Sequence, residues 1–145
     1  MNSISKYFLL GFLLLSFSAL MIGQSSLNPL PDCPKSPNCF ASQVGSKNWK
    51  KKPLLFNGTL EVSIEKLLDL LDAMPGATHV SSDRKMIQYT FQTKVGKFID
   101  DVHFSVDEKN KRFHFRSASR KGYSDMGANK RRMKKIRRLW EDNSQ

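Results

Sequence analysis

The sequence is poor in acidic residues. It has 13 aspartates and glutamates against 24 lysines and arginines in 145 residues, which gives a formal net charge of +11. The surplus is uneven, because residues 130–138 (KRRMKKIRR) carry seven positive charges. Such a surplus favours anionic partners, here an anionic membrane surface or an envelope polymer. No nucleic-acid recognition motif accompanies it, so nucleic acid is not an expected partner.

Internal repeats are also missing, and the length leaves room for one domain and little more. About 120 residues remain beyond the N-terminal segment, enough for a single modest core. The apolar content of 39% is that of a folded globular chain and excludes a disordered one. We expect three parts: a targeting segment at 1–24, a tether and clipped arm at 25–59, and an α+β domain at 60–145.

Long hydrophobic runs are missing except at the N-terminus. Lys6 precedes an apolar run from Tyr7 to Ile22. A signal peptide needs an apolar region of ~7–15 residues and a spanning helix needs ~20, so this run lies nearer the signal peptide. No Ala-x-Ala cleavage site follows it, although Gly23 and Ser25 are small. We expect a signal peptide or an uncleaved membrane anchor, and a domain exported to the periplasm or the extracytoplasmic face of the membrane.

Cysteine is scarce: the only two are Cys33 and Cys39, in the motif CPKSPNC. In an oxidising compartment this spacing predicts a disulfide. Pro34 and Pro37 restrict the loop between the two cysteines. A zinc site is the alternative, but the pair has no nearby His or further Cys to complete four ligands. We therefore expect no metal and no cofactor.

Two segments have helical periodicity. Apolar residues recur at helical spacing from Leu60 to Met74. Thr59 or Ser63 is placed to cap the start, and Pro75 follows the end. The second helix is expected from residue 127 or 128 to Glu141. Its apolar stripe is Met133, Ile136 and Trp140.

Other segments alternate apolar and polar residues, the pattern of half-buried strands. They span 87–92, 101–106 and 112–116, with a weaker candidate at 78–81. A turn at 107–110 joins two of them as a hairpin. Together the elements predict an α+β fold, with an antiparallel sheet of about four strands packed against two helices.

The hairpin register can be proposed from its aromatic residues. Pairing Phe104 with Phe113 places Asp101 opposite Arg116 on the polar face. Opposite charges across a ladder stabilise it by ~0.2–1 kcal/mol. The same register turns Asp100 inward.

An inward Asp100 would lie beside Ser117 and need a partner, because an unpaired buried charge is costly. Arg120 or the start of the last helix is expected to supply that partner.

The stretch 116–132 (RSASRKGYSDMGANKRR) is the densest in polar groups. Guanidinium groups, hydroxyls and a helix start could bind an anion. Alternatively, Asp100 and Asp101 occupy those donors in an internal network. The candidate ligand-binding residues are Asp100, Asp101, Arg116, Ser117, Ser119, Arg120, Tyr123, Ser124, Asp125 and Asn129.

A hydrolase is the rival hypothesis, with Ser117 or Ser119 as nucleophile and Asp100 as the acid. A serine nucleophile needs a base within hydrogen-bond reach. The proposed register pairs His103 with His114 on the opposite strand face, so neither is such a base. A metal could in principle bind between these two histidines and Asp101, but we expect their side chains to be exposed and to form no metal site. We predict no catalytic residue.

Three motifs resemble those of a known family. They are CPKSPNC at 33–39, FIDDV at 98–102 and RSASRKGYSDMGANKRR at 116–132, in the family's order. By these motifs the chain resembles the domain of unknown function family 1499 over residues 30–140. The family has no established activity, so the resemblance implies neither a substrate nor a reaction.

The basic residues of the last helix are expected to line the side away from its apolar stripe. That side would lie on an anionic membrane or polymer, or would simply be solvated. Together these features predict an exported, non-enzymatic binding or structural domain of the cell envelope that binds an anionic ligand or surface. The basic residues are Lys130, Arg131, Lys134, Lys135, Arg137 and Arg138.

Overall fold

A computed structural model of the protein describes residues 30–42 and 51–143. The predicted signal or anchor segment at 1–24 lies outside these residues. Within the described residues, no helix is long and apolar enough to cross a membrane.

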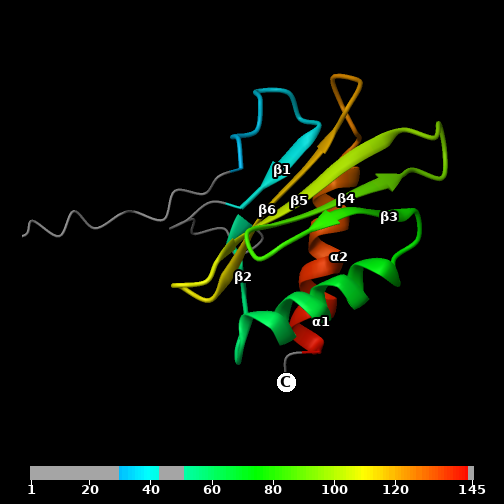
Figure 1. The fold of residues 1–145 in the computed structure, drawn as a ribbon. Helices are drawn as coiled ribbons and strands as arrows, with labels where there is room; N and C mark the ends of the chain where they lie inside the picture. The colour runs from blue at the N-terminus through cyan, green and yellow to red at the C-terminus, as the bar shows by residue number, and fades with distance from the viewer. Residues whose placement is uncertain (1–29, 43–50, 144–145) are drawn as a thin grey trace, which may run out of the picture.

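Two helices cover one face of a single antiparallel sheet (Figure 1), which confirms the predicted α+β class. The sheet has six strands in the order β1-β6-β5-β4-β3, with β2 also paired to β6. The elements are β1 (Cys39–Ala41), β2 (Leu54–Leu55), α1 (Leu60–Asp72), β3 (Ala77–Ser82), β4 (Met86–Gln92), β5 (Ile99–Asp107), β6 (Arg112–Ser119) and α2 (Ala128–Asp142).

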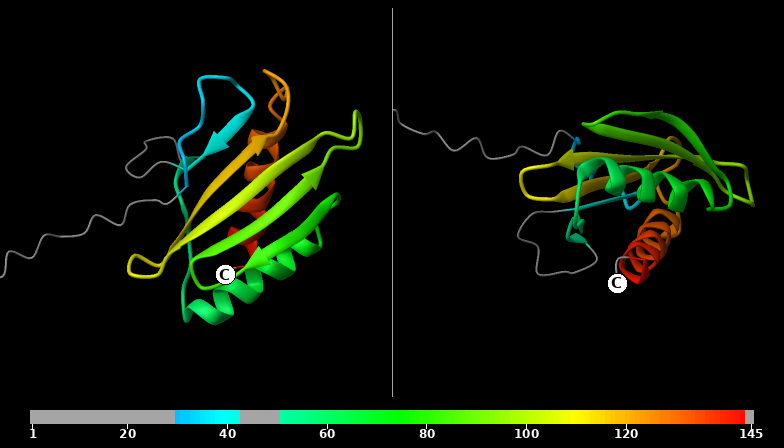
Figure 2. Two further views of the ribbon diagram at one scale, coloured as in Figure 1. Left: turned by 45° about the horizontal axis from the view of Figure 1, so that its top comes forward. Right: turned by 60° about the horizontal axis from the view of Figure 1, so that its bottom comes forward.

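The core lies between the sheet and the two helices, both of which lie on the same side of it (Figure 2). From α2, Met133 and Ile136 are buried, and from α1, Leu67 and Leu71 are buried, as the helical spacing predicts. Thr59 caps α1 by accepting a hydrogen bond from the amide of Val62. The sheet contributes Ile87, Tyr89, Phe91, Val102, Phe104, Phe113 and Phe115 to this core.

The strand count exceeds the prediction because the arm joins the sheet. β1 and β2 are only three and two residues long, and both add to the edge formed by β6. β2 coincides with a short apolar patch, whereas β1 is too short to show a period of two. The disulfide between Cys33 and Cys39 is confirmed, with a Cα–Cα distance of 5.6 Å.

The predicted hairpin register is wrong by two residues. Phe104 lies opposite Phe115, not Phe113. A two-residue slip leaves every side chain on its predicted face, so the apolar pattern cannot detect it. The turn determines the register instead. The Asp107 carboxylate accepts hydrogen bonds from Asn110 and from Arg112 Nε at 2.7 Å, and Asp107 and Arg112 form the last residue pair before the turn.

The slip changes every predicted cross-strand pair on the polar face. Asp101 lies opposite Ala118 and His103 lies opposite Arg116. His114 lies opposite Ser105. The predicted pairs of Asp101 with Arg116 and of His103 with His114 are therefore wrong.

His114 is 1% exposed although it lies on the polar face, so the expectation that it is exposed is wrong. Its Nε2 is 3.7 Å from the Asp107 carboxylate, and neither ring nitrogen has a hydrogen bond within the described residues. Burial, and then the nearby Arg112, lower the pKa of His114, although Asp107 opposes both effects. The folded chain therefore favours the neutral imidazole.

This histidine predicts loss of stability in mild acid. Below the unfolded-state pKa of about 6.5, the unfolded chain takes up the proton more readily than the folded one, so the free energy of unfolding falls as pH falls. Urea denaturation from pH 7.5 to 5 should show a shallower fall for His114→Gln than for the wild type. Identical slopes for the two proteins would contradict this assignment.

Candidate functional site

The candidate site lies where β6 ends and α2 begins. Asp100 near the start of β5 pairs with Ser119 near the end of β6. Their side chains share the inner face of the sheet with Ser117, which is fully buried. The first turns of α2 lie over this end of the sheet and bring Asn129 and Arg132 to the same place. The prediction that Asp100 points inward is therefore correct. Its partner across the sheet is Ser119, however, and not Ser117 as predicted.

Asn129 is the centre of the hydrogen-bond network. Its side chain is fully buried, and its Oδ1 accepts from the Ser117 hydroxyl at 2.5 Å. Its Nδ2 donates to Ser119 Oγ at 3.0 Å, to the carbonyl oxygen of Asn38 at 3.0 Å and to Asp125 Oδ2 at 2.8 Å. One amide therefore connects the disulfide-bearing arm, β6 and the approach to α2.

Arg132 neutralises Asp100 inside the protein. Its Nη2 donates to Asp100 Oδ2 at 2.6 Å, and its Nη1 donates to Ser117 Oγ at 3.0 Å and to Asn129 Oδ1 at 2.7 Å. The guanidinium carbon also lies 4.8 Å from the centre of the Phe91 ring, a favourable cation–π position. The predicted partner at the start of the last helix is therefore Arg132, and not Arg120.

Asp125 caps α2 from two residues before the helix's N-cap position. That position is Gly127, which has no side chain to cap the helix. Asp125 Oδ1 accepts from the Gly127 amide at 2.8 Å, and Oδ2 accepts from the Asn129 amide at 2.7 Å. Burial tends to raise the pKa of Asp125, but these hydrogen bonds outweigh it and lower the pKa. A carboxylate at this end also complements the helix dipole.

The arm is fastened to the same network through Asn38. Its backbone carbonyl accepts from the Ser119 amide at 3.0 Å as well as from Asn129. Its side-chain Nδ2 donates to the carbonyl oxygen of Gly122 at 2.5 Å, and its Oδ1 accepts from Ser36 at 2.8 Å. The CPKSPNC ring and the 116–132 stretch therefore form one structural unit.

The predicted site residues divide into two groups. Ser117, Ser119, Asp125, Asn129 and Asp100 converge in the buried network described above. The rest lie apart: Arg120 forms an exposed ion pair with Asp101 at 2.8 Å, Arg116 lies on the opposite face of β6, Tyr123 is 76% exposed, and Ser124 accepts from the Met126 amide.

The serines are engaged as structural groups. The Ser117 hydroxyl donates to Asn129 and accepts from Arg132, neither of which is a base. Among the hydrogen bonds of the described residues, none joins either serine to Asp100. Likewise, no group of three or more His, Cys, Asp or Glu within those residues is arranged to hold a metal ion.

A cavity of about 400 Å³ opens beside the network. It lies between the β4–β5 turn and the loop before α2, which Figure 1 shows at the same end of the sheet. Asp100 and Ser119 belong to its lining, with Phe98, Lys121 and Arg131 among the other residues. Composition and periodicity give no sign of this cavity, because it depends on how two separate loops meet.

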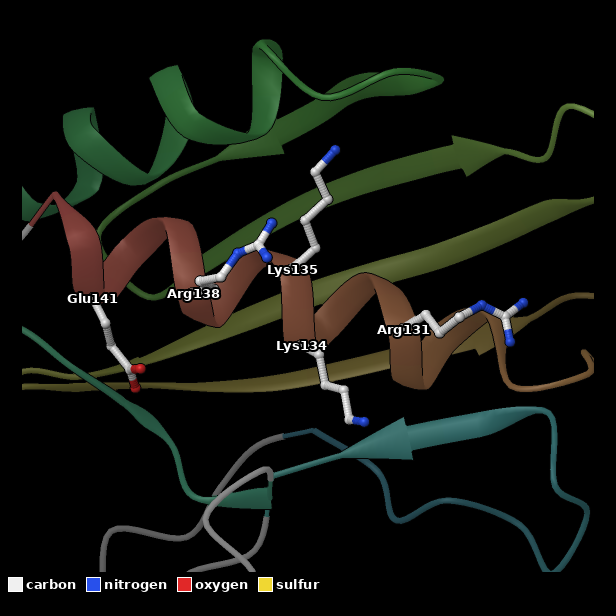
Figure 3. Close-up of a pocket in the computed structure, with 5 residues that line it drawn as sticks. All are labelled: Arg131, Lys134, Lys135, Arg138 and Glu141. Carbon is white, nitrogen blue, oxygen red and sulfur yellow. The ribbon is translucent and has the colours of Figure 1, made fainter.

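A second depression, of about 430 Å³, lies on the basic side of α2 (Figure 3). The prediction that Arg137 belongs to this exposed face is wrong. Arg137 is 5% exposed, pairs with Glu141 at 3.1 Å and donates to the carbonyl oxygen of Lys52. The residues around the depression are Arg131, Lys134, Lys135, Arg138 and Glu141.

Sequence reasoning missed Arg132 as a site residue, although a signal for it exists. The buried stripe of α2 continues towards the N-terminus at helical spacing. Arg132 lies four residues before Ile136, and Asn129 lies four residues before Met133. Two polar residues on the buried stripe of a helix need polar partners inside the protein. Arg132 and Asn129 therefore indicate a buried charge such as that of Asp100.

Removing the central amide should destabilise the fold. Asn129→Ala leaves the Ser117 hydroxyl without its acceptor and Ser119 Oγ without its donor, and it removes one of the two donors to the Asn38 carbonyl. We expect the free energy of unfolding in urea to fall by about 2–4 kcal/mol. Asn57→Ala removes an exposed asparagine and should change it by less than about 0.5 kcal/mol. Equal effects from the two variants would show that the network contributes little.

Comparison with known proteins agrees with the motifs. The family model described as "Protein of unknown function (DUF1499)" matches residues 29–139, which include the disulfide ring, the sheet, both helices as far as Leu139 and the buried network. No curated protein and no solved structure matched the chain. A match over most of the chain is sufficient to assign the family, and the protein is a member of the DUF1499 family.

Proposed function

We propose that the protein is an exported, non-enzymatic binding domain of the cell envelope that attaches to an anionic surface through the exposed side of α2. The observation that carries this proposal is the cluster of Arg131, Lys134, Lys135 and Arg138 around one shallow depression. We call these four residues the basic face.

Three residues of the basic face have no acidic partner among the ion pairs of the described residues. They are Lys135, Arg138 and Arg131, and Arg131 donates to a neutral carbonyl, that of Met126, at 2.7 Å. The only acidic residue in the lining is Glu141, which pairs with Arg137. The four charges are close together, and those of Arg131, Lys135 and Arg138 are exposed, so their potentials would add at an anionic surface.

The geometry of the face also suits a surface better than a small ligand. In Figure 3 the labelled side chains extend from successive turns of α2. A bilayer or polymer can contact the four basic side chains at once. Each basic residue near an anionic bilayer contributes on the order of 1 kcal/mol to binding.

Export is supported by two features. The N-terminal sequence has the character of a signal or anchor, and the Cys33–Cys39 disulfide is compatible with an oxidising compartment. Against the rival hydrolase, both serine hydroxyls bond within the network. These contacts suit a scaffold rather than an activated nucleophile.

Vesicle binding tests the proposal. The exported chain should sediment with vesicles that contain an anionic phospholipid and not with neutral phosphatidylcholine vesicles. Lys135→Glu combined with Arg138→Glu should weaken binding by more than about tenfold, and higher salt should weaken the wild type.

The matched control reverses two charges elsewhere. Lys85→Glu combined with Lys109→Glu changes the net charge equally but lies in the β3–β4 and β5–β6 turns. It should retain most of the binding. An equal loss in both double variants would indicate attraction through net charge alone, and no loss in the α2 variant would exclude the basic face.

A further inference from the structure

The cavity beside the buried network is contiguous with the basic face, because Arg131 lines both depressions. Its volume of about 400 Å³ is enough for a small polar headgroup. It combines three kinds of group: a buried carboxylate, cationic side chains and exposed apolar side chains. Each places a different demand on a ligand.

The carboxylate is that of Asp100, which is 1% exposed. One oxygen, Oδ2, accepts from Arg132 at 2.6 Å. The other, Oδ1, is buried and has no hydrogen-bond donor within the described residues. A buried acceptor without a donor is costly, so a ligand that supplies one gains more here than at an exposed carboxylate.

The ion pair with Arg132 also determines which donor suits this oxygen. Arg132 already balances the charge of Asp100, so an ammonium group would add an unbalanced positive charge beside a guanidinium. A hydroxyl group donates a hydrogen bond without adding charge. The Asp100 carboxylate in the cavity lining therefore favours a ligand with hydroxyl groups.

The cationic groups at the cavity are Lys121 and Arg131. The remaining acidic residue in the lining, Asp125, uses both carboxylate oxygens to hold the start of α2. Lysine and arginine side chains both bind phosphate, lysine as a compact charge and arginine as a planar fork.

The apolar side chains lie on the two loops that form the cavity. Val95 is 86% exposed, Phe98 is 56% exposed and Met126 is 88% exposed, and all three belong to the lining. Exposed apolar groups gathered at one place mark a surface that a partner covers. A soluble polyol phosphate would leave them in water, whereas the interface of a bilayer would bury them.

We propose that this cavity binds the headgroup of an anionic phospholipid that carries hydroxyl groups, of the phosphatidylglycerol type. A headgroup hydroxyl donates to Asp100 Oδ1, the phosphate lies between Lys121 and Arg131, and the lipid interface covers Val95, Phe98 and Met126. This inference rests on the proposed attachment to an anionic surface and adds a preference among anionic lipids to it.

Two lipids of equal charge allow the headgroup preference to be tested separately from the attachment to an anionic surface. Phosphatidylglycerol and phosphatidylmethanol each carry one negative charge, but only the first has headgroup hydroxyls. At equal mole fraction in phosphatidylcholine vesicles, the wild type should bind phosphatidylglycerol about fivefold more tightly, the effect of about one net hydrogen bond.

One variant of the cavity should remove the preference between the two lipids and leave the attachment intact. Ala128→Leu places a larger side chain in the lining at the first residue of α2. It should equalise the two lipids while binding to phosphatidylmethanol stays unchanged. Val95→Ser should weaken binding to both lipids, and Val80→Ser, the same change at an exposed position on β3, should not.

The outcomes are distinguishable. Binding to neither lipid means that the proposed function fails and this inference with it. Equal binding of both lipids by the wild type overturns the headgroup preference and leaves the proposed function intact. A preference that persists in Ala128→Leu has the same two consequences, because it would not arise in this cavity. Competition by soluble glycerophosphoglycerol as strong as that by the lipid would overturn the lipid as the source of the ligand.

Discussion

The buried ion pair between Asp100 and Arg132 is the constraint on which the arrangement of this end of the domain depends. A carboxylate on the inner face of a sheet cannot stay charged without a partner. Arg132, in the first turns of α2, is that partner: its Nη2 lies 2.6 Å from Asp100 Oδ2, and its guanidinium lies over the Phe91 ring. A buried pair need not stabilise a fold more than apolar groups would, but breaking it is expensive. The pair therefore fixes where α2 begins relative to β5 and β4.

The other polar groups of the stretch complete this arrangement. Asn129 connects the serines of β6, Asp125 and the backbone of Asn38, so that the disulfide-bearing arm, the sheet and α2 are held at one point. The stretch 116–132, whose sequence suggests a binding loop, is therefore mostly structural: it is the joint between β6 and α2. The groups with capacity for a partner lie around it: the basic face of α2 and the cavity next to Asp100.

Much of the fold follows from periodicity, because the spacing of apolar residues determines which side of each element is buried. The same reasoning places Asp100 inward. It cannot set the β5–β6 register, since a slip of two residues preserves both faces and only the Asp107 turn distinguishes them. Nor can it foresee β1, whose three residues are held by tertiary pairing. Part of the site was predictable from Asn129 and Arg132 on the buried stripe of α2, whereas the cavity depends on two loops distant in sequence.

A double-mutant cycle on Asp100 and Arg132 tests the central claim most directly. Urea denaturation would give the free energy of unfolding for Asp100→Asn, Arg132→Met and the double variant. We expect each single change to cost about 3 kcal/mol and the double variant to cost less than their sum by roughly 2 kcal/mol, since the second change removes a charge that the first leaves unpaired. Effects that add to within about 0.5 kcal/mol would contradict the claim that this ion pair organises the joint.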